Sequence, residues 1–158
     1  MNEKLQHRLH LASTLGVVGS ILAIITSTLA TLGSLITILV GSVISSATLG
    51  AWLEPVLKSP YYTDQLDSMM ILQNLDFLKG GIVISGIIVF ILGLLFIFFS
   101  VKMLHFSREY RTDLNHQHAI YMIVFSVFLI FSGRPLCGAL LLTSGILAYT
   151  VKEQLLET

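Results

Sequence analysis

From Leu11 to Leu53 the chain contains no ionisable residue. As one α-helix this stretch would reach roughly 65 Å, which is twice the hydrocarbon thickness of a bilayer. Such a run is typical of a membrane-spanning segment, and it restricts the fold more than any other feature of the sequence. The composition agrees, because 54% of the 158 residues are hydrophobic and 11% are charged, whereas soluble domains carry about 25% charged residues.

Charged residues also delimit a second span. Residues 54–79 form a polar, net acidic segment, and residues 80–101 are uncharged. The uncharged run has the length that a single helix needs to cross a bilayer. We therefore predict a second membrane helix over residues 80–101, followed by a polar inner loop over residues 102–118.

The last part of the chain is predicted to form a helical hairpin. Residues 119–133 and 136–151 are apolar, and Arg134-Pro135 interrupts them after Ser132-Gly133. Gly and Pro both break helices, so a turn is expected here. An arginine at the centre of the bilayer would cost roughly 2.5–3.5 kcal/mol or more, and we therefore expect Arg134 at the outer interface.

The stretch over residues 11–53 allows two interpretations. It is either two spans with a turn near residues 31–34, or one long helix whose far end leaves the membrane. Positive charge favours cytoplasmic segments and supports the second interpretation. With one helix, the inner side holds Lys4, Arg8, Lys102, Arg108, Arg111 and Lys152, and the outer side holds Lys58, Lys79 and Arg134. A cleaved signal peptide ending near residues 28–30 is a competing interpretation.

We thus predict an all-α integral membrane four-helix bundle with one membrane domain over residues 1–158 and both termini in the cytoplasm. Small residues recur at helix-contact spacing, and such stripes let helices approach closely in lipid. They are expected to form the seams of the bundle. The residues concerned are Gly16, Gly19, Ala23, Ser27, Gly86, Gly93, Gly138 and Gly145.

The outer segment is predicted to contain a short amphipathic helix. Apolar residues recur in it at spacings near three and four, with polar residues between them. This helix is expected to pack against its own bundle or, alternatively, to bind a partner together with aromatic residues nearby. The candidate partner-binding residues are Trp52, Tyr61, Tyr62, Leu66, Met69 and Met70.

The sequence offers little support for catalysis or cofactor binding. No ionisable residue other than Arg134 falls within the predicted membrane helices, which argues against a proton-coupled pump. His105, His116 and His118 suggest a metal site, but metal sites need three or four ligands in fixed geometry, and solvated loop histidines are the expected alternative. We expect no enzyme activity, no cofactor and no metal. The balanced charge gives no expectation of nucleic-acid binding.

The pattern resembles small bacterial four-span membrane proteins of unknown function. The shared features are the long first helix, the outer insert, the Gly-containing second helix ending at Lys102, and the closing hairpin with its run over residues 138–148 and its end at Lys152. The resemblance covers most of the chain. It implies a location in the bacterial cell membrane and brings with it no catalytic residue and no activity.

Two classes of function fit these expectations. The first is an accessory, regulatory or immunity-type protein that binds another membrane or extracellular protein. The alternative is a transporter or channel component, as a homo-oligomer around the Ser- and Thr-rich seam of the first helix.

Overall fold

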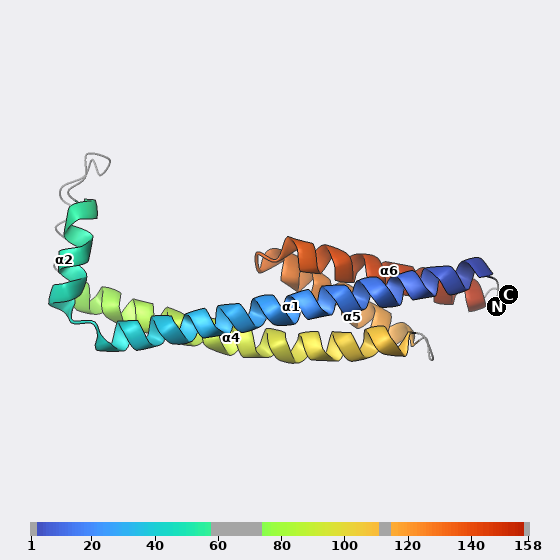
Figure 1. Ribbon diagram of the computed structural model, residues 1–158, viewed down its shortest axis with the longest axis horizontal. Coiled ribbons are helices and arrows are strands. Elements are labelled where there is room, and N and C mark those ends of the chain that lie inside the picture. The colour runs from blue at the N-terminus through green and yellow to red at the C-terminus, as the bar shows by residue number, and fades with distance from the viewer. Residues whose placement is uncertain (1–2, 58–73, 111–114, 157–158) are drawn as a thin grey trace. The chain divides into compact units, whose positions relative to one another are not determined.

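The structure is a computed structural model that describes residues 3–57, 74–110 and 115–156. The described part is all-α, as the sequence predicts (Figure 1). They are α1 (Glu3–Val43), α2 (Ser46–Leu57), α4 (Leu75–Glu109), α5 (His116–Phe131) and α6 (Pro135–Leu156).

The prediction of one helix over residues 11–53 is wrong at its carboxy-terminal end. The long helix α1 ends at Val43, and a separate helix, α2, begins at Ser46. The break follows from local capping chemistry, because the Ser45 hydroxyl accepts a hydrogen bond from the backbone N–H of Thr48 at 3.1 Å. A turn within residues 31–34 is also absent, since α1 is continuous there.

The helix expected over residues 80–101 is longer at both ends. Helix α4 has 35 residues, from Leu75 to Glu109, so it includes much of the segment predicted as an inner loop. After the undescribed residues 111–114, Asn115 caps α5, and its side chain accepts a hydrogen bond from the N–H of Gln117 at 3.1 Å.

Helices α5 and α6 form a hairpin at the position where the sequence predicts one. Gly133 has a φ of +82°, in the left-handed region that glycine adopts without strain. The Arg134 N–H donates to the Leu129 carbonyl at 3.0 Å, and Pro135 then occupies the first position of α6, where its missing N–H costs nothing. This turn fixes where the Arg134 side chain leaves the backbone.

The chain divides into two compact units. Unit 1 comprises residues 1–28 and 94–158, and unit 2 comprises residues 29–93. Unit 1 contains a core from α1, α4, α5 and α6, in which the largest buried side chains are Tyr110, Met122, Leu129, Leu141 and Val151. Unit 2 contains α2 and the paired remaining parts of α1 and α4.

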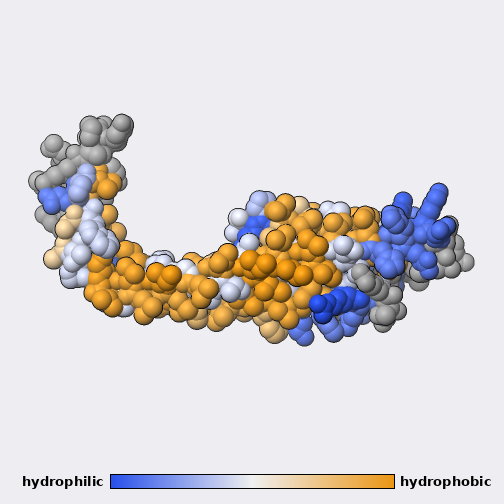
Figure 2. Space-filling view, viewed as in Figure 1, coloured by the Kyte–Doolittle hydropathy of each residue, from blue (hydrophilic) through white to orange (hydrophobic). Residues whose placement is uncertain are grey.

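The outer surface of the helices is strongly apolar (Figure 2). In the described part of the chain, α1, α4 and α6 are long and apolar enough to cross a membrane, and α5 is a shorter apolar helix. Phe131 is 86% exposed and Leu136 is 67% exposed at the two sides of the α5–α6 turn. These helices are therefore compatible with membrane insertion.

Candidate functional site

The first candidate feature is the set of glycine contacts inside unit 1. Gly16 on α1 faces Ser107 and Ser144, so a side chain there would collide with both hydroxyls. A Cβ on Gly138 would lie 2.7 Å from the Ser126 carbonyl oxygen, and one on Gly145 would lie 3.2 Å from the Ala119 carbonyl oxygen. The hairpin thus depends on glycine for its close approach of α6 to α5.

Unit 2 contains a similar contact between α1 and α4. Gly93 faces the side chain of Thr31, and a Cβ on Gly86 would lie 2.8 Å from Ile38 Cγ1. A Cβ on Gly41 would lie 3.0 Å from Val83 Cγ2. Here every atom closer than 3.4 Å belongs to a side chain, which can move, and the neighbouring backbone atoms lie farther away.

Each glycine among the predicted packing residues lies close to atoms of a neighbouring helix. Besides the glycines described above, Gly19 faces Leu140 and Leu141, and Ala23 and Ser27 are fully buried. Sequence analysis identified Gly86 and Gly93 but not the full period of seven to which they belong. The residues that follow it are Ser13, Ser20, Ser27, Ser34 and Gly41 on α1, and Gly86, Gly93, Ser100 and Ser107 on α4.

A seven-residue period keeps one face of a helix against its neighbour over many turns. The period is readable in the sequence, because Ser13, Ser20, Ser27 and Ser34 are each separated by seven residues. The seven-residue pattern also explains why so many serines are buried, since a small side chain is needed at each close approach.

Several buried hydroxyls donate hydrogen bonds to backbone carbonyls, and the Ser20 hydroxyl is an exception. Ser144 Oγ donates to the Ala12 carbonyl at 2.7 Å and joins α6 to α1, whereas Ser107 Oγ donates to the Met103 carbonyl of its own helix at 2.7 Å. Ser20 Oγ is buried without a hydrogen-bond partner in the described structure. A hydroxyl needs an adjacent base to act as a nucleophile, and these hydroxyls face carbonyls or apolar groups.

Two groups of unit 1 position the Arg134 side chain. Its Nη1 donates to Ser27 Oγ, and its Cζ lies 5.0 Å from the centre of the Phe96 ring. The Phe96 ring itself lies 6.1 Å from the ring of Phe125 on α5. The guanidinium is thus positioned by a hydroxyl and by an aromatic face, an arrangement that stabilises a cation without neutralising it.

The position of Arg134 shows that two predicted placements cannot both hold. Phe96, beside the guanidinium, precedes Lys102 by only about 9 Å of helix rise along α4. A hydrocarbon layer of about 30 Å therefore cannot lie between Arg134 and Lys102. The prediction that Arg134 marks the outer interface and Lys102 the inner boundary is wrong, because the α5–α6 hairpin reaches only as far as Ser27 and Phe96.

A second polar cluster lies where α4 meets α5. Glu109 Oε1 is 2.9 Å from His105 Nε2, and Glu109 Oε2 is 3.4 Å from His118 Nδ1. The His118 ring stacks on Phe106 with the ring centres 4.0 Å apart. His118 is therefore part of the helix packing rather than a solvated loop residue, and the described residues contain no group of three metal-ligating side chains.

Tyr110 is buried at this end of unit 1. It follows the last residue of α4, is 1% exposed, and donates from its hydroxyl to Met122 Sδ at 3.0 Å. Burial raises the pKa of Tyr110 above its ordinary value, because the apolar surroundings disfavour the phenolate. The residue acts here as a neutral, buried donor.

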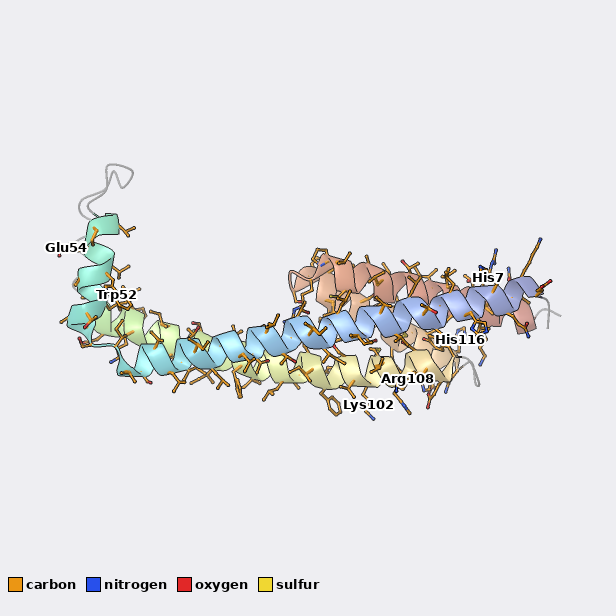
Figure 3. All side chains as sticks on the ribbon, in the orientation of Figure 1. His7, Trp52, Glu54, Lys102, Arg108 and His116 are labelled. Atoms are coloured by element: carbon orange, nitrogen blue, oxygen red, sulfur yellow. The ribbon has the colours of Figure 1, made fainter. Side chains whose placement is uncertain are left out.

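The predicted partner-binding residues are only partly described. Trp52 lies on α2 with 63% of its surface exposed (Figure 3), and near the start of the same helix Ser46 Oγ donates to Asp76. The predicted amphipathic helix and the other candidates lie outside the described residues. These are Tyr61, Tyr62, Leu66, Met69 and Met70.

Together these features define, for the described residues, an all-α structure with three membrane-compatible helices, seams of small residues and an arginine positioned by Ser27 and Phe96. Comparison of the chain with models of protein families, with curated proteins and with solved structures gives no match.

Proposed function

We propose that the protein is a multi-pass integral membrane protein of the cell membrane that acts by binding another protein, as an accessory, regulatory or immunity-type protein. The main support is that the apolar surface of unit 1 continues past the point where α4 becomes charged. Lys102, His105 and Arg108 are exposed on α4, and Figure 3 shows Lys102 and Arg108 pointing away from α1.

Apolar side chains are exposed at that same level of unit 1. Gly16 on α1 faces Ser107, so the exposed Leu11 and Val18 lie beside the charged segment of α4. On α5, Ile120 is exposed two residues after His118, which stacks on Phe106. A bilayer aligned with the uncharged part of α4 would not cover these side chains.

The length of α1 supports the same proposal. Its exposed apolar residues extend from Leu11 to Val43, about 50 Å along the helix. To fit this length into a hydrocarbon layer of about 30 Å, the helix would have to tilt by about 53°, beyond the usual range of 0–40°. A partner protein that covers part of the apolar surface removes this mismatch.

The termini are proposed to lie in the cytoplasm, on the side that Lys102 and Arg108 mark. In the accessory and regulatory forms of the proposal, the partner is a membrane protein that contacts unit 1. The immunity-type form instead relies on residues 54–79, most of which lie outside the described structure.

A photo-crosslinking amino acid at Leu11 or Val18 tests the proposal in native membranes. We expect the same protein adduct from both positions. Ile88, an exposed residue within the uncharged part of α4, is the matched control and should give mainly lipid adducts. Lipid adducts alone at all three positions, with a monomer after extraction in mild detergent, would contradict the proposal.

The alternative of a transporter or channel component has weaker support. A pore around the hydroxyl-rich seam of α1 would need that seam to face a second copy or a conduit. Instead, Ser13, Ser20 and Ser27 are fully buried within unit 1, against other helices of the same chain. The seam therefore contributes to the internal packing of the chain, and it leaves the exposed apolar surface for a partner.

A further inference from the structure

We propose that Arg134 is the recognition point for the partner, and that it pairs with an Asp or Glu carboxylate on an apolar helix of that partner. This inference rests on the proposed membrane location and deepens it by naming the chemistry that the partner must present. Four observations lead to it: the depth of Arg134, its fixed position, its missing countercharge and the apolar surface around it.

The depth of Arg134 makes an uncompensated charge costly. The guanidinium lies beside Phe96, within the uncharged run of α4 that ends at Val101. When the bilayer is aligned with that run, the guanidinium lies about 9 Å inside the level of Lys102. Ionisable residues at such depths pair with another group or line a functional pathway.

The side chain is held in place before any partner arrives. Nη1 donates to Ser27 Oγ, the Phe96 ring lies against the guanidinium, and the hydrogen bond from the Arg134 N–H to Leu129 fixes the backbone. A guanidinium has five N–H donors in a planar arrangement, and Ser27 is its one hydrogen-bond acceptor in the described structure. The remaining donors are arranged to bind a carboxylate through two parallel hydrogen bonds.

Unit 1 does not supply the countercharge among its described residues. Its described carboxylates are Glu3, Glu109 and Glu153, and all of them belong to its opposite end. Glu109 is the one on α4, about 20 Å of helix rise beyond Phe96. It is also already paired with His105 and His118.

A second copy of the chain does not supply the countercharge either. The apolar part of α1, the uncharged run of α4, and the whole of α5 contain no Asp or Glu, and α6 contains none before Glu153. An oligomer of identical chains would bring arginines together at this depth without an anion. The partner must therefore be a different protein.

The surface around Arg134 fits an apolar helix. Phe131 and Leu136, on the two sides of the turn, are the most exposed large hydrophobic residues of α5 and α6 among those whose side chains the structure describes. Phe128, one turn before Phe131, is also exposed. A lipid phosphate could also pair with a guanidinium, but phosphates lie outside the hydrocarbon, and here the guanidinium itself lies inside it.

A synthetic helix provides the test. Leucine- and alanine-rich membrane peptides with a central Asp, Asn or Leu are reconstituted with the full-length protein in phosphatidylcholine vesicles, and association is measured by fluorescence energy transfer. We expect the Asp peptide to bind at least about tenfold more tightly than the Leu peptide. The Asn peptide should lie between them.

Variants of the protein assign the effect to Arg134. Arg134→Gln should remove the preference for Asp, and Arg134→Lys should keep part of it, because charge remains but the planar pair of donors is lost. Lys102→Gln is the matched control at a nearby level and should change the preference less than twofold. Circular dichroism of each variant shows whether the helices are retained. Ser27→Ala keeps the charge, and it should reduce the preference less than Arg134→Gln does, because Phe96 and the backbone hydrogen bond of Arg134 still position the guanidinium.

Three results would overturn the inference. An Asp preference that survives in Arg134→Gln would place the recognition elsewhere. An equal loss in Lys102→Gln would indicate diffuse attraction, and abolition of the preference by phosphatidylglycerol in the vesicles would identify a lipid phosphate as the occupant. Each of these results is independent of the crosslinking at Leu11 and Val18, so a failure here is distinguishable from a failure of the proposed function.

Discussion

Unit 1 and unit 2 are built from the same two long helices but are stabilised in different ways. The cluster of buried hydrophobic residues in the described structure lies wholly within unit 1, where α5 and α6 cover α1 and α4. In unit 2 the contacts of α1 with α4 are made by Gly93, Gly86 and Gly41, and exposed apolar residues occupy much of the remaining surface.

The two units therefore have different sources of stability. Unit 1 buries side chains against other parts of the same chain, so a core substitution there acts directly on folding. The helix pair in unit 2 buries little apolar surface. Close packing at its small residues is the main attraction between the two helices. Unit 2 therefore depends more strongly on the lipid or protein around it.

The largest expected effect is that of Gly138→Leu in unit 1. The Cβ would lie 2.7 Å from the Ser126 carbonyl oxygen, and backbone atoms cannot move aside without separating α5 from α6. We expect a loss of about 3 kcal/mol or more in the free energy of unfolding, measured in detergent by circular dichroism.

Gly80→Leu is the matched control, because a Cβ on Gly80 meets no atom within 4 Å. It should change the free energy of unfolding by less than about 1 kcal/mol. Equal losses in the two variants would show that the close contact of the hairpin is not what stabilises unit 1.

Gly93→Leu probes unit 2 and should have a smaller effect. Its Cβ would collide with the Thr31 side chain, which can change rotamer, so we expect a loss of about 1–2 kcal/mol. Hydrogen exchange measured by mass spectrometry should increase within residues 29–93 and remain unchanged in α5 and α6. An equal increase in the hairpin would contradict the separation into two units.

Ser144→Ala tests a single hydrogen bond between helices of unit 1. The Ser144 hydroxyl donates to the Ala12 carbonyl, and hydrogen bonds of this kind contribute about 0.6–1.7 kcal/mol in membrane proteins. Ser126→Ala is the control, because that hydroxyl donates to Ile123 on its own helix. If the control lost as much stability as Ser144→Ala, the bond between the helices would have no special role.

The smallest effect at neutral pH is expected from the ionisation of Tyr110. Its folded-state pKa is raised by burial, while the unfolded value is about 10. Stability is therefore unaffected below about pH 10 and falls above it, because the unfolded chain then releases a proton that the folded chain retains.

The measurement compares the wild type with Tyr110→Phe as the pH is raised. The difference between their unfolding midpoints should shift against the wild type above about pH 10. An identical pH dependence of the two proteins would show that Tyr110 ionises as readily in the folded state as in the unfolded one.

The sequence predicts those parts of the fold that depend on residues close together along the chain. Uncharged runs place α4 and the two arms of the hairpin, since apolar length and the turn chemistry around Gly133 are readable directly. The break after Val43 was missed because the sequence there remains uncharged, although Ser45 carries a capping signal.

The candidate site depends on contacts between distant residues and was predicted only in part. Small residues at the seams follow from their spacing, but no local pattern shows that Arg134 bonds Ser27 rather than facing the outer interface. The sequence analysis placed each positive charge by its position along the chain. In the structure, Arg134 lies beside Phe96, six residues before Lys102 on α4, although Lys102 and Arg134 are far apart in sequence.

The hydrogen bond from Ser144 to Ala12 also has a consequence for biosynthesis. Its two residues are 132 positions apart, so at about 5–20 residues per second Ala12 is added to the chain roughly 7–26 seconds before Ser144. During that interval the serines of α1 have no α6 to pack against. We therefore expect the insertion machinery to shield the first helix until the last hairpin has been synthesised.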